Sequence, residues 1–91
     1  MKITEIRNKL IEKGLKVTPQ RIAILEAIIK LNNHPTADNI IDYIRNHHPN
    51  IATATVYKVL DAFVANELIR IDFFKAPVII YILYHILSLF R

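Results

Sequence analysis

The sequence predicts a mainly α-helical fold, a winged helix-turn-helix with an apolar C-terminal tail. Four segments carry apolar residues at helical spacing, start and stop signals separate them, and an alternating segment follows the fourth. Ninety-one residues suffice for one small domain. The order helix, helix, short turn, helix, strand is that of a winged helix-turn-helix. We therefore expect a winged-helix domain over residues 1–74 and an apolar tail over residues 75–91.

The first two helices have clear boundary signals. The first is predicted over about residues 4–13, because Gly14 is a stop signal. Its apolar residues are Ile6, Leu10 and Ile11. The second begins at Thr18 and Pro19. The first N–H groups of a helix have no partner within it, so a threonine oxygen at the N-cap can accept from one of them, and a proline in the first turn has no N–H to satisfy. Its buried stripe is predicted to be Ile22, Leu25, Ile28 and Ile29.

The third and fourth helices form the predicted turn unit, joined by a short turn over residues 47–50. Thr36 is expected to cap the third helix, which extends to about Asn46. Its inward residues are Ile40, Ile41 and Ile44. The fourth helix is predicted over about residues 53–66. Its inward residues are Val56, Val59, Leu60 and Phe63. Residues 68–73 alternate in polarity and are predicted to form the first strand of a wing.

The outward face of the fourth helix offers hydroxyl groups, an aromatic ring and a cation. Its residues are Thr53, Thr55, Tyr57, Lys58 and Asp61. Such groups can contact thymine methyls, base edges and phosphates when a helix N-terminus enters the major groove. The alternative is an ordinary amphipathic helix whose polar face meets only water. The order of the elements favours the DNA-binding interpretation.

The charge of the chain is unevenly distributed. Residues 1–21 hold six basic against two acidic residues, and residues 22–91 hold six of each, so the net charge of +4 lies at one end. A concentrated basic region attracts a polyanion through counterion release, although a solvated helix face has the same composition. Cysteine is absent, and with it disulfides, Cys-based zinc sites and a cysteine nucleophile. No pattern of catalytic residues predicts an enzyme, and the charged N-terminus predicts a cytoplasmic protein.

The C-terminal tail contains a nearly unbroken apolar run. It covers thirteen residues, 78–90, and spanning a membrane takes roughly 20, so a membrane span is not expected. Pro77 could start a helix there, or the β-branched residues could form a second wing strand. The apolar side chains of this run must be buried. They could pack against the domain, against a lipid interface, or against a second copy of the chain in a homodimer formed through the tail. A rival function follows, in which residues 77–90 make the chain a protein-interaction or membrane-surface module.

Three motifs in order resemble the ferric uptake regulator family, and its branch of peroxide-responsive repressors most of all. They are GLKVTPQR over residues 14–21, HPTAD over residues 34–38 and ATVYKVL over residues 54–60. The resemblance covers about residues 1–70, the family's N-terminal DNA-binding half. It implies a winged-helix domain that binds AT-rich operators in double-stranded DNA as a dimer and represses transcription when metal-loaded.

The resemblance implies roles for individual residues. The DNA-binding candidates are Lys16, Arg21, Thr53, Thr55, Tyr57 and Lys58. Tyr57 matches the tyrosine that contacts thymine in the major groove, and Lys58 lies beside it. Lys16 matches the lysine that reaches the minor groove. Arg21 matches an arginine at the start of the second helix, where it would lie near phosphate or fix the helix. Thr55 could serve the fold as much as the DNA.

The chain also departs from the family pattern. Ala52 stands where many relatives have a capping serine, so Asn50 or Thr53 would have to cap a shifted helix. His34 matches a regulatory metal ligand, but its partner ligands lie in a dimerisation domain that the sequence lacks. We therefore expect no cofactor in this form, whereas full-length relatives bind divalent Fe, Mn or Zn. The apolar run after Arg70 suggests a truncated or frame-shifted regulator. His47 and His48 are expected to be exposed.

Overall fold

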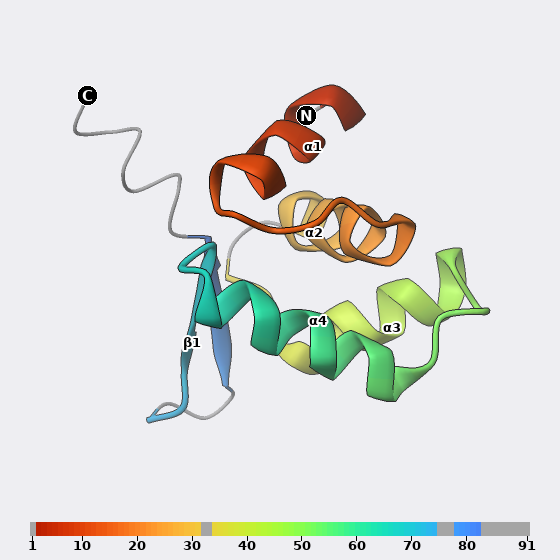
Figure 1. Ribbon diagram of the computed structural model, residues 1–91. Coiled ribbons are helices and arrows are strands. Elements are labelled where there is room, and N and C mark those ends of the chain that lie inside the picture. The colour runs from red at the N-terminus through yellow and green to blue at the C-terminus, as the bar shows by residue number, and fades with distance from the viewer. Residues whose placement is uncertain (1, 32–33, 75–77, 83–91) are drawn as a thin grey trace.

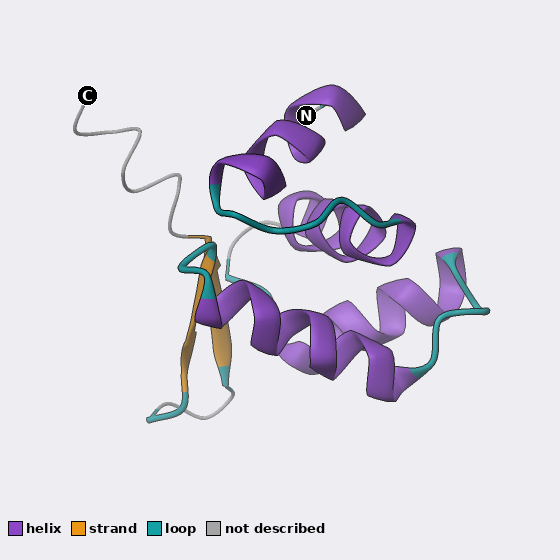
Figure 2. Ribbon diagram, viewed as in Figure 1, coloured by secondary structure: helices purple, strands orange, loops and turns teal. Residues whose placement is uncertain are grey.

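The computed structural model of the chain describes residues 2–31, 34–74 and 78–82 (Figures 1 and 2). These residues form four helices and one antiparallel pair of strands, which confirms the mainly helical, winged-helix architecture. In chain order the elements are α1 Ile3–Glu12, α2 Pro19–Leu31, α3 Ala37–His47, α4 Thr53–Ala65, β1 Ile69–Asp72 and β2 Ile79–Ile82. Among the described helices, none combines the length and apolarity needed to cross a membrane.

Helix α1 packs through a narrow apolar stripe. Ile6 and Leu10 are fully buried, as predicted, but Ile11 is 59% exposed, so its predicted inward position is wrong. Successive residues of a helix are rotated by about 100°, and Ile11 therefore lies beside the stripe that Ile6 and Leu10 define. Beyond the helix, the Leu15 N–H donates to the Leu10 carbonyl at 2.9 Å, which closes the helix end.

Gly14 closes α1 in a left-handed conformation, with φ of +77°, and no atom lies within 4 Å of where a Cβ would stand. Gly14→Ala is therefore expected to lower the free energy of unfolding by about 1 kcal/mol through the backbone alone. Gly14→Asn should cost less, because asparagine tolerates this region better. Urea denaturation followed by circular dichroism measures both values. Equal stability of the alanine variant and the wild type would contradict the expectation.

Helix α2 lies at the centre of the helical layer, in contact with α1, α3 and α4. Leu25 and Ile28 are buried as predicted, but the other two predicted residues, Ile22 and Ile29, are only half-buried at the edge of the core. Residues not predicted are buried instead, namely Ala23, Ile24 and Ala27. A helix covered on several sides has no single inward stripe. The apolar periodicity therefore predicted only two of the four proposed stripe residues correctly. Thr18 Oγ1 accepts from the Arg21 N–H at 3.2 Å, as a cap should.

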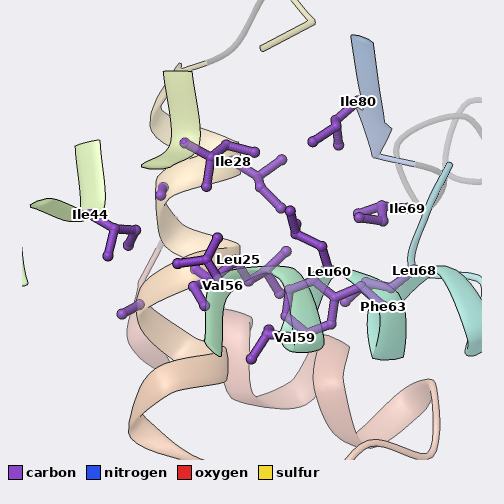
Figure 3. Packing of buried hydrophobic residues seen from close by; sticks show 14 of the residues in the cluster. Leu25, Ile28, Ile44, Val56, Val59, Leu60, Phe63, Leu68, Ile69 and Ile80 are labelled. Atoms are coloured by element: carbon purple, nitrogen blue, oxygen red, sulfur yellow. The ribbon is translucent and has the colours of Figure 1, made fainter. Parts of the chain in front are cut away.

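Helices α3 and α4 follow the sequence prediction closely. Thr36 Oγ1 accepts from the Asn39 N–H at 3.1 Å, while Asn39 Oδ1 accepts from the Thr36 N–H at 3.0 Å, forming a reciprocal capping box. All the residues predicted to point inward from these two helices are buried: Ile40, Ile41, Ile44, Val56, Val59, Leu60 and Phe63. Figure 3 shows the α4 residues gathered with Leu25 and Ile28 of α2.

The wing is a two-stranded hairpin attached to the helices at its base. Strands β1 and β2 pair from Ile69↔Ile82 to Asp72↔Ile79. The Ile80 N–H donates to the Pro35 carbonyl at 2.9 Å, and Ile80 is 1% exposed, close to Ile69 in Figure 3. The start of the apolar run is thus a strand, the second of the two forms that the sequence left open. Residues 83–91 of the tail lie outside the described residues.

Candidate nucleic-acid interface

Helix α4 presents a polar face on the side away from the core. Its buried stripe packs towards α2, which lies above α4 in the view of Figure 1. The opposite side therefore faces solvent, where Tyr57 is 48% exposed and Lys58 and Asp61 are exposed. Tyr57 and Lys58 follow each other in the helix, so their side chains leave it about 100° apart, both on its exposed part. Both are accessible to a ligand without any change in the core.

The two threonines predicted as contact residues lie at the start of α4 and are both half-buried. Thr53 is the first residue of the helix, and Ala52 is its N-cap without a side-chain hydrogen bond. The Ala52 carbonyl accepts from the Thr55 N–H at 3.0 Å and from the Val56 N–H at 3.2 Å. The helix start has therefore not shifted to an Asn50 or Thr53 cap. Unsatisfied amide groups remain at this terminus and favour an anion there.

A serine in place of Ala52 would supply the missing cap oxygen. Ala52→Ser is expected to raise the free energy of unfolding by about 1 kcal/mol, because its hydroxyl can accept from an orphan amide of the first turn. Ala54→Ser is the matched control, since the exposed Ala54 lies inside the helix, where a hydroxyl caps nothing. Urea denaturation of the two variants measures the difference. If the two substitutions changed the free energy of unfolding equally, the N-cap position of α4 would not be lacking a hydrogen-bond acceptor.

The other two candidates, Lys16 and Arg21, lie around the connection between α1 and α2. Arg21 Nη1 donates to the Lys16 carbonyl at 2.8 Å, and Arg21 is half-buried while Lys16 is exposed. Of the two roles considered for Arg21, the geometry supports fixing the chain: its guanidinium holds the segment that displays the Lys16 ammonium. The candidates therefore form two groups, one on this connection and one on α4.

His34 lies at the junction of the helices and the wing. It is exposed, has a φ of 61°, and its ring centroid is 4.7 Å from that of Tyr81 on β2. The Arg70 guanidinium of β1 lies 5.0 Å from the centroid of the same Tyr81 ring. Local sequence patterns do not predict these contacts of Tyr81, because they depend on the register of the hairpin. Within the described residues, no group of three or more His, Cys, Asp or Glu side chains could hold a metal ion.

The two histidines before α4 differ in exposure. His47 is exposed, as predicted, with its ring stacked on Tyr43 at 4.0 Å and its Nδ1 2.9 Å from the Tyr43 carbonyl oxygen. His48 is half-buried, so its predicted exposure is wrong; its N–H donates to the Ile44 carbonyl at 2.7 Å at the C-cap of α3.

Comparison with protein families and curated proteins identifies similar chains. The model of the ferric uptake regulator family matches residues 12–81. The peroxide operon regulator of Bacillus subtilis (strain 168) is 40% identical over 68 residues, which are 75% of this chain and 47% of that protein. The peroxide-responsive repressor PerR of Staphylococcus saprophyticus is 44% identical over 61 residues, 67% of this chain and 38% of that protein. The chain thus spans less than half the length of these two relatives.

Solved structures show the same arrangement of elements. The ferric uptake regulator from Pseudomonas aeruginosa with manganese has a TM-score of 0.74 at 26% identity, over 85% of this chain and 59% of that one. The Vibrio cholerae ferric uptake regulator has a TM-score of 0.70 at 27% identity, over 84% and 60% of the two chains. A PerR from Streptococcus pyogenes has a TM-score of 0.68 at 26% identity, over 88% and 56%.

Proposed function

Because the chain belongs to the ferric uptake regulator family, we propose that it is a transcriptional regulator that binds double-stranded DNA through α4. The matched relatives are a peroxide operon regulator and a peroxide-responsive repressor, and are not enzymes. We propose repression as the outcome of binding, an AT-rich operator as the site, and the cytoplasm as the location. One observation carries the proposal: Tyr57 and Lys58 are both exposed on the side of α4 that lies away from the core, and the buried stripe of the same helix anchors it in that core.

The chemistry of α4 suits the major groove. The Tyr57 ring offers apolar contact for a thymine methyl, and its hydroxyl can bond a base edge. The Lys58 ammonium and the uncapped amides at the start of the helix suit phosphate oxygens. Thr53 and Thr55, half-buried at that end, would present their hydroxyls beside the same phosphates. A thymine contact would favour an A·T pair at that position, since only A·T pairs carry that methyl group. An AT-rich operator is what the resemblance to the family implies.

The basic N-terminal region would add contacts without base specificity. Residues 1–21 carry the entire net charge of +4. Lys16 is exposed on a segment whose backbone Arg21 fixes, so its ammonium can reach a phosphate or the edge of the minor groove with little loss of backbone entropy. Long-range attraction by this region would raise the rate of association and make affinity depend strongly on salt.

The proposal is tested by titrating the full chain against an AT-rich palindromic duplex in a mobility-shift assay at two salt concentrations. We expect binding that weakens as salt rises, with a slope of about −0.9 in log affinity per log salt for each phosphate contact. A GC-rich duplex of equal length should bind more weakly at both concentrations. Binding indifferent to salt, or equal on the two duplexes, would count against the proposal.

We also propose that this chain binds DNA without a metal. The related ferric uptake regulator from Pseudomonas aeruginosa was solved with manganese, but the described residues of this chain provide no cluster of ligands, and His34 could supply a single one. A lone imidazole holds a divalent ion weakly. The DNA affinity is therefore expected to be the same with EDTA as with Mn²⁺ or Zn²⁺ in the mobility-shift assay. A clear gain in affinity on adding either metal would contradict this.

A further inference from the structure

The wing has an open edge. The sheet contains only β1 and β2, and β2 carries on its other side an isolated bridge between Ile79 and Thr36. The other side of β1 faces no further strand among the described residues, and Figure 1 shows β1 to the left of the bluer β2. An open edge presents backbone N–H and C=O groups that can pair with another strand. We propose that it pairs with the same edge of a second copy, forming an antiparallel four-stranded sheet about a two-fold axis.

Backbone geometry limits the registers that such a pair can adopt. Along a strand, the N–H and C=O groups of successive residues point alternately to one side and the other. Residues directly opposite in an antiparallel pair must both point towards the partner or both away from it. When the two strands are identical, opposite residues must therefore be separated by an even number of positions. The two-fold axis then passes through a residue of β1 and not between two residues.

Charge selects one of these registers. An axis through Arg70 would place Arg70 opposite Arg70 of the copy, and an axis through Asp72 would place two carboxylates opposite each other. Like charges in directly opposite positions are destabilising. An axis through Ile69 would bring Leu68 into the ladder, but its N–H already donates to the Phe63 carbonyl at 2.9 Å. An axis through Ile71 places Arg70 opposite Asp72 of the copy twice, so this is the register we assign.

The side chains at the edge can reach each other in the assigned register. Arg70 is exposed on the outer face, and its guanidinium lies 5.0 Å from the ring centroid of Tyr81 on β2, so the side chain would have to turn from β2 to the open edge to meet Asp72 of the copy. Asp72 Oδ1 accepts from the Phe74 N–H at 3.0 Å. Because a carboxylate can accept several hydrogen bonds, a bond from Arg70 of the copy would add to the contacts that Asp72 already makes.

Apolar side chains would gain cover from the same pairing. The half-buried Ile71 would lie on the axis, beside Ile71 of the copy. Phe73 is 72% exposed directly after β1, and the register brings it opposite Ile69 of the copy. Exposed aromatic side chains at an open edge are typical of an interaction site. The proposal does not depend on DNA binding, so either proposal can fail alone.

Charge reversal tests the register in the full chain, using light scattering across a dilution series. We expect the wild type to dimerise, and Arg70→Asp or Asp72→Arg each to raise the dissociation constant of the dimer at least roughly tenfold, because two attractive pairs become repulsive. The double variant should recover most of the wild-type constant, because the opposite charges are restored in exchanged positions. A monomeric wild type, or association that none of the three variants alters, would overturn the proposal.

Disulfide trapping gives a second test, since the chain has no cysteine of its own. On the axis, the two Cα atoms of Ile71→Cys would be about 4.5–5.5 Å apart, within disulfide range. Phe73→Cys is the control. Residue 73 is more exposed than residue 71, but the two cysteines of the dimer would lie roughly 13 Å apart along the strands. Under mild oxidation we expect a covalent dimer for Ile71→Cys only. Cross-linking of Phe73→Cys at an equal rate, or none for a folded Ile71→Cys, would contradict the register.

Discussion

Alanine at both Tyr57 and Lys58 is expected to lower the affinity of the chain for an AT-rich duplex roughly a hundredfold, since a base contact contributes about 1–3 kcal/mol and the phosphate contact of Lys58 adds to it. Tyr57 is 48% exposed and Lys58 is exposed, so the change leaves the core intact. Fluorescence anisotropy with a labelled duplex measures the affinity. The salt slope should also become shallower by about one unit, because one phosphate contact is lost.

The matched control removes the same charge far from the start of α4 in sequence. Lys30 lies in the last turn of α2, where its ammonium is 3.9 Å from Glu26. Lys30→Ala should lower the affinity only slightly, through the net charge. Circular dichroism should show that both variants keep the helical content of the wild type. If the double variant and the Lys30 variant bind DNA equally well, α4 is not the reading element.

Phe63→Ala is expected to lower the free energy of unfolding by about 3–5 kcal/mol. Phe63 is fully buried, and in Figure 3 its ring lies among Leu60, Val59 and Leu68, so alanine would leave a cavity where the helices meet the wing. A domain of this size has a total stability of about 5–15 kcal/mol, so the loss is a large fraction of it. Urea denaturation followed by circular dichroism measures the change.

Val64→Ala is the control for the loss of stability, because it shortens the next side chain of the same helix at a site that is 39% exposed. Its effect should stay within about 0.5 kcal/mol, as for most surface substitutions. A Phe63 variant as stable as the Val64 variant would show that the core does not depend on this ring.

Local signals explain why α3 and α4 could be predicted from the sequence. The Thr36 cap lies next to the helix that it starts, and each of the two helices has one buried face whose spacing can be read directly. The candidate face of α4 followed from the same pattern, because it is the complement of the buried stripe. These predictions needed no knowledge of distant parts of the chain.

Features that depend on distant contacts could not be predicted. The stripe of α2 was partly misplaced because three other helices surround it. Residues 79–82 were equally consistent with a helix or a strand until pairing with β1 and the bond to Pro35 decided between them. The contacts of Tyr81 with Arg70 and His34 depend on that pairing as well. Whether residues 75–91 act as a tail that replaces a further domain stays a prediction, as does a dimer contact or interaction module made by that tail.

The most direct test of the central claim maps the DNA contacts by amide chemical-shift perturbation on the ¹⁵N-labelled full chain. If the outward face of α4 reads DNA, an AT-rich duplex should shift the amides of residues 53–61 most strongly, with a second group around Lys16. The amide of Lys30 on α2 should shift least. Perturbations that leave residues 53–61 unchanged while affecting other parts of the chain would contradict the account.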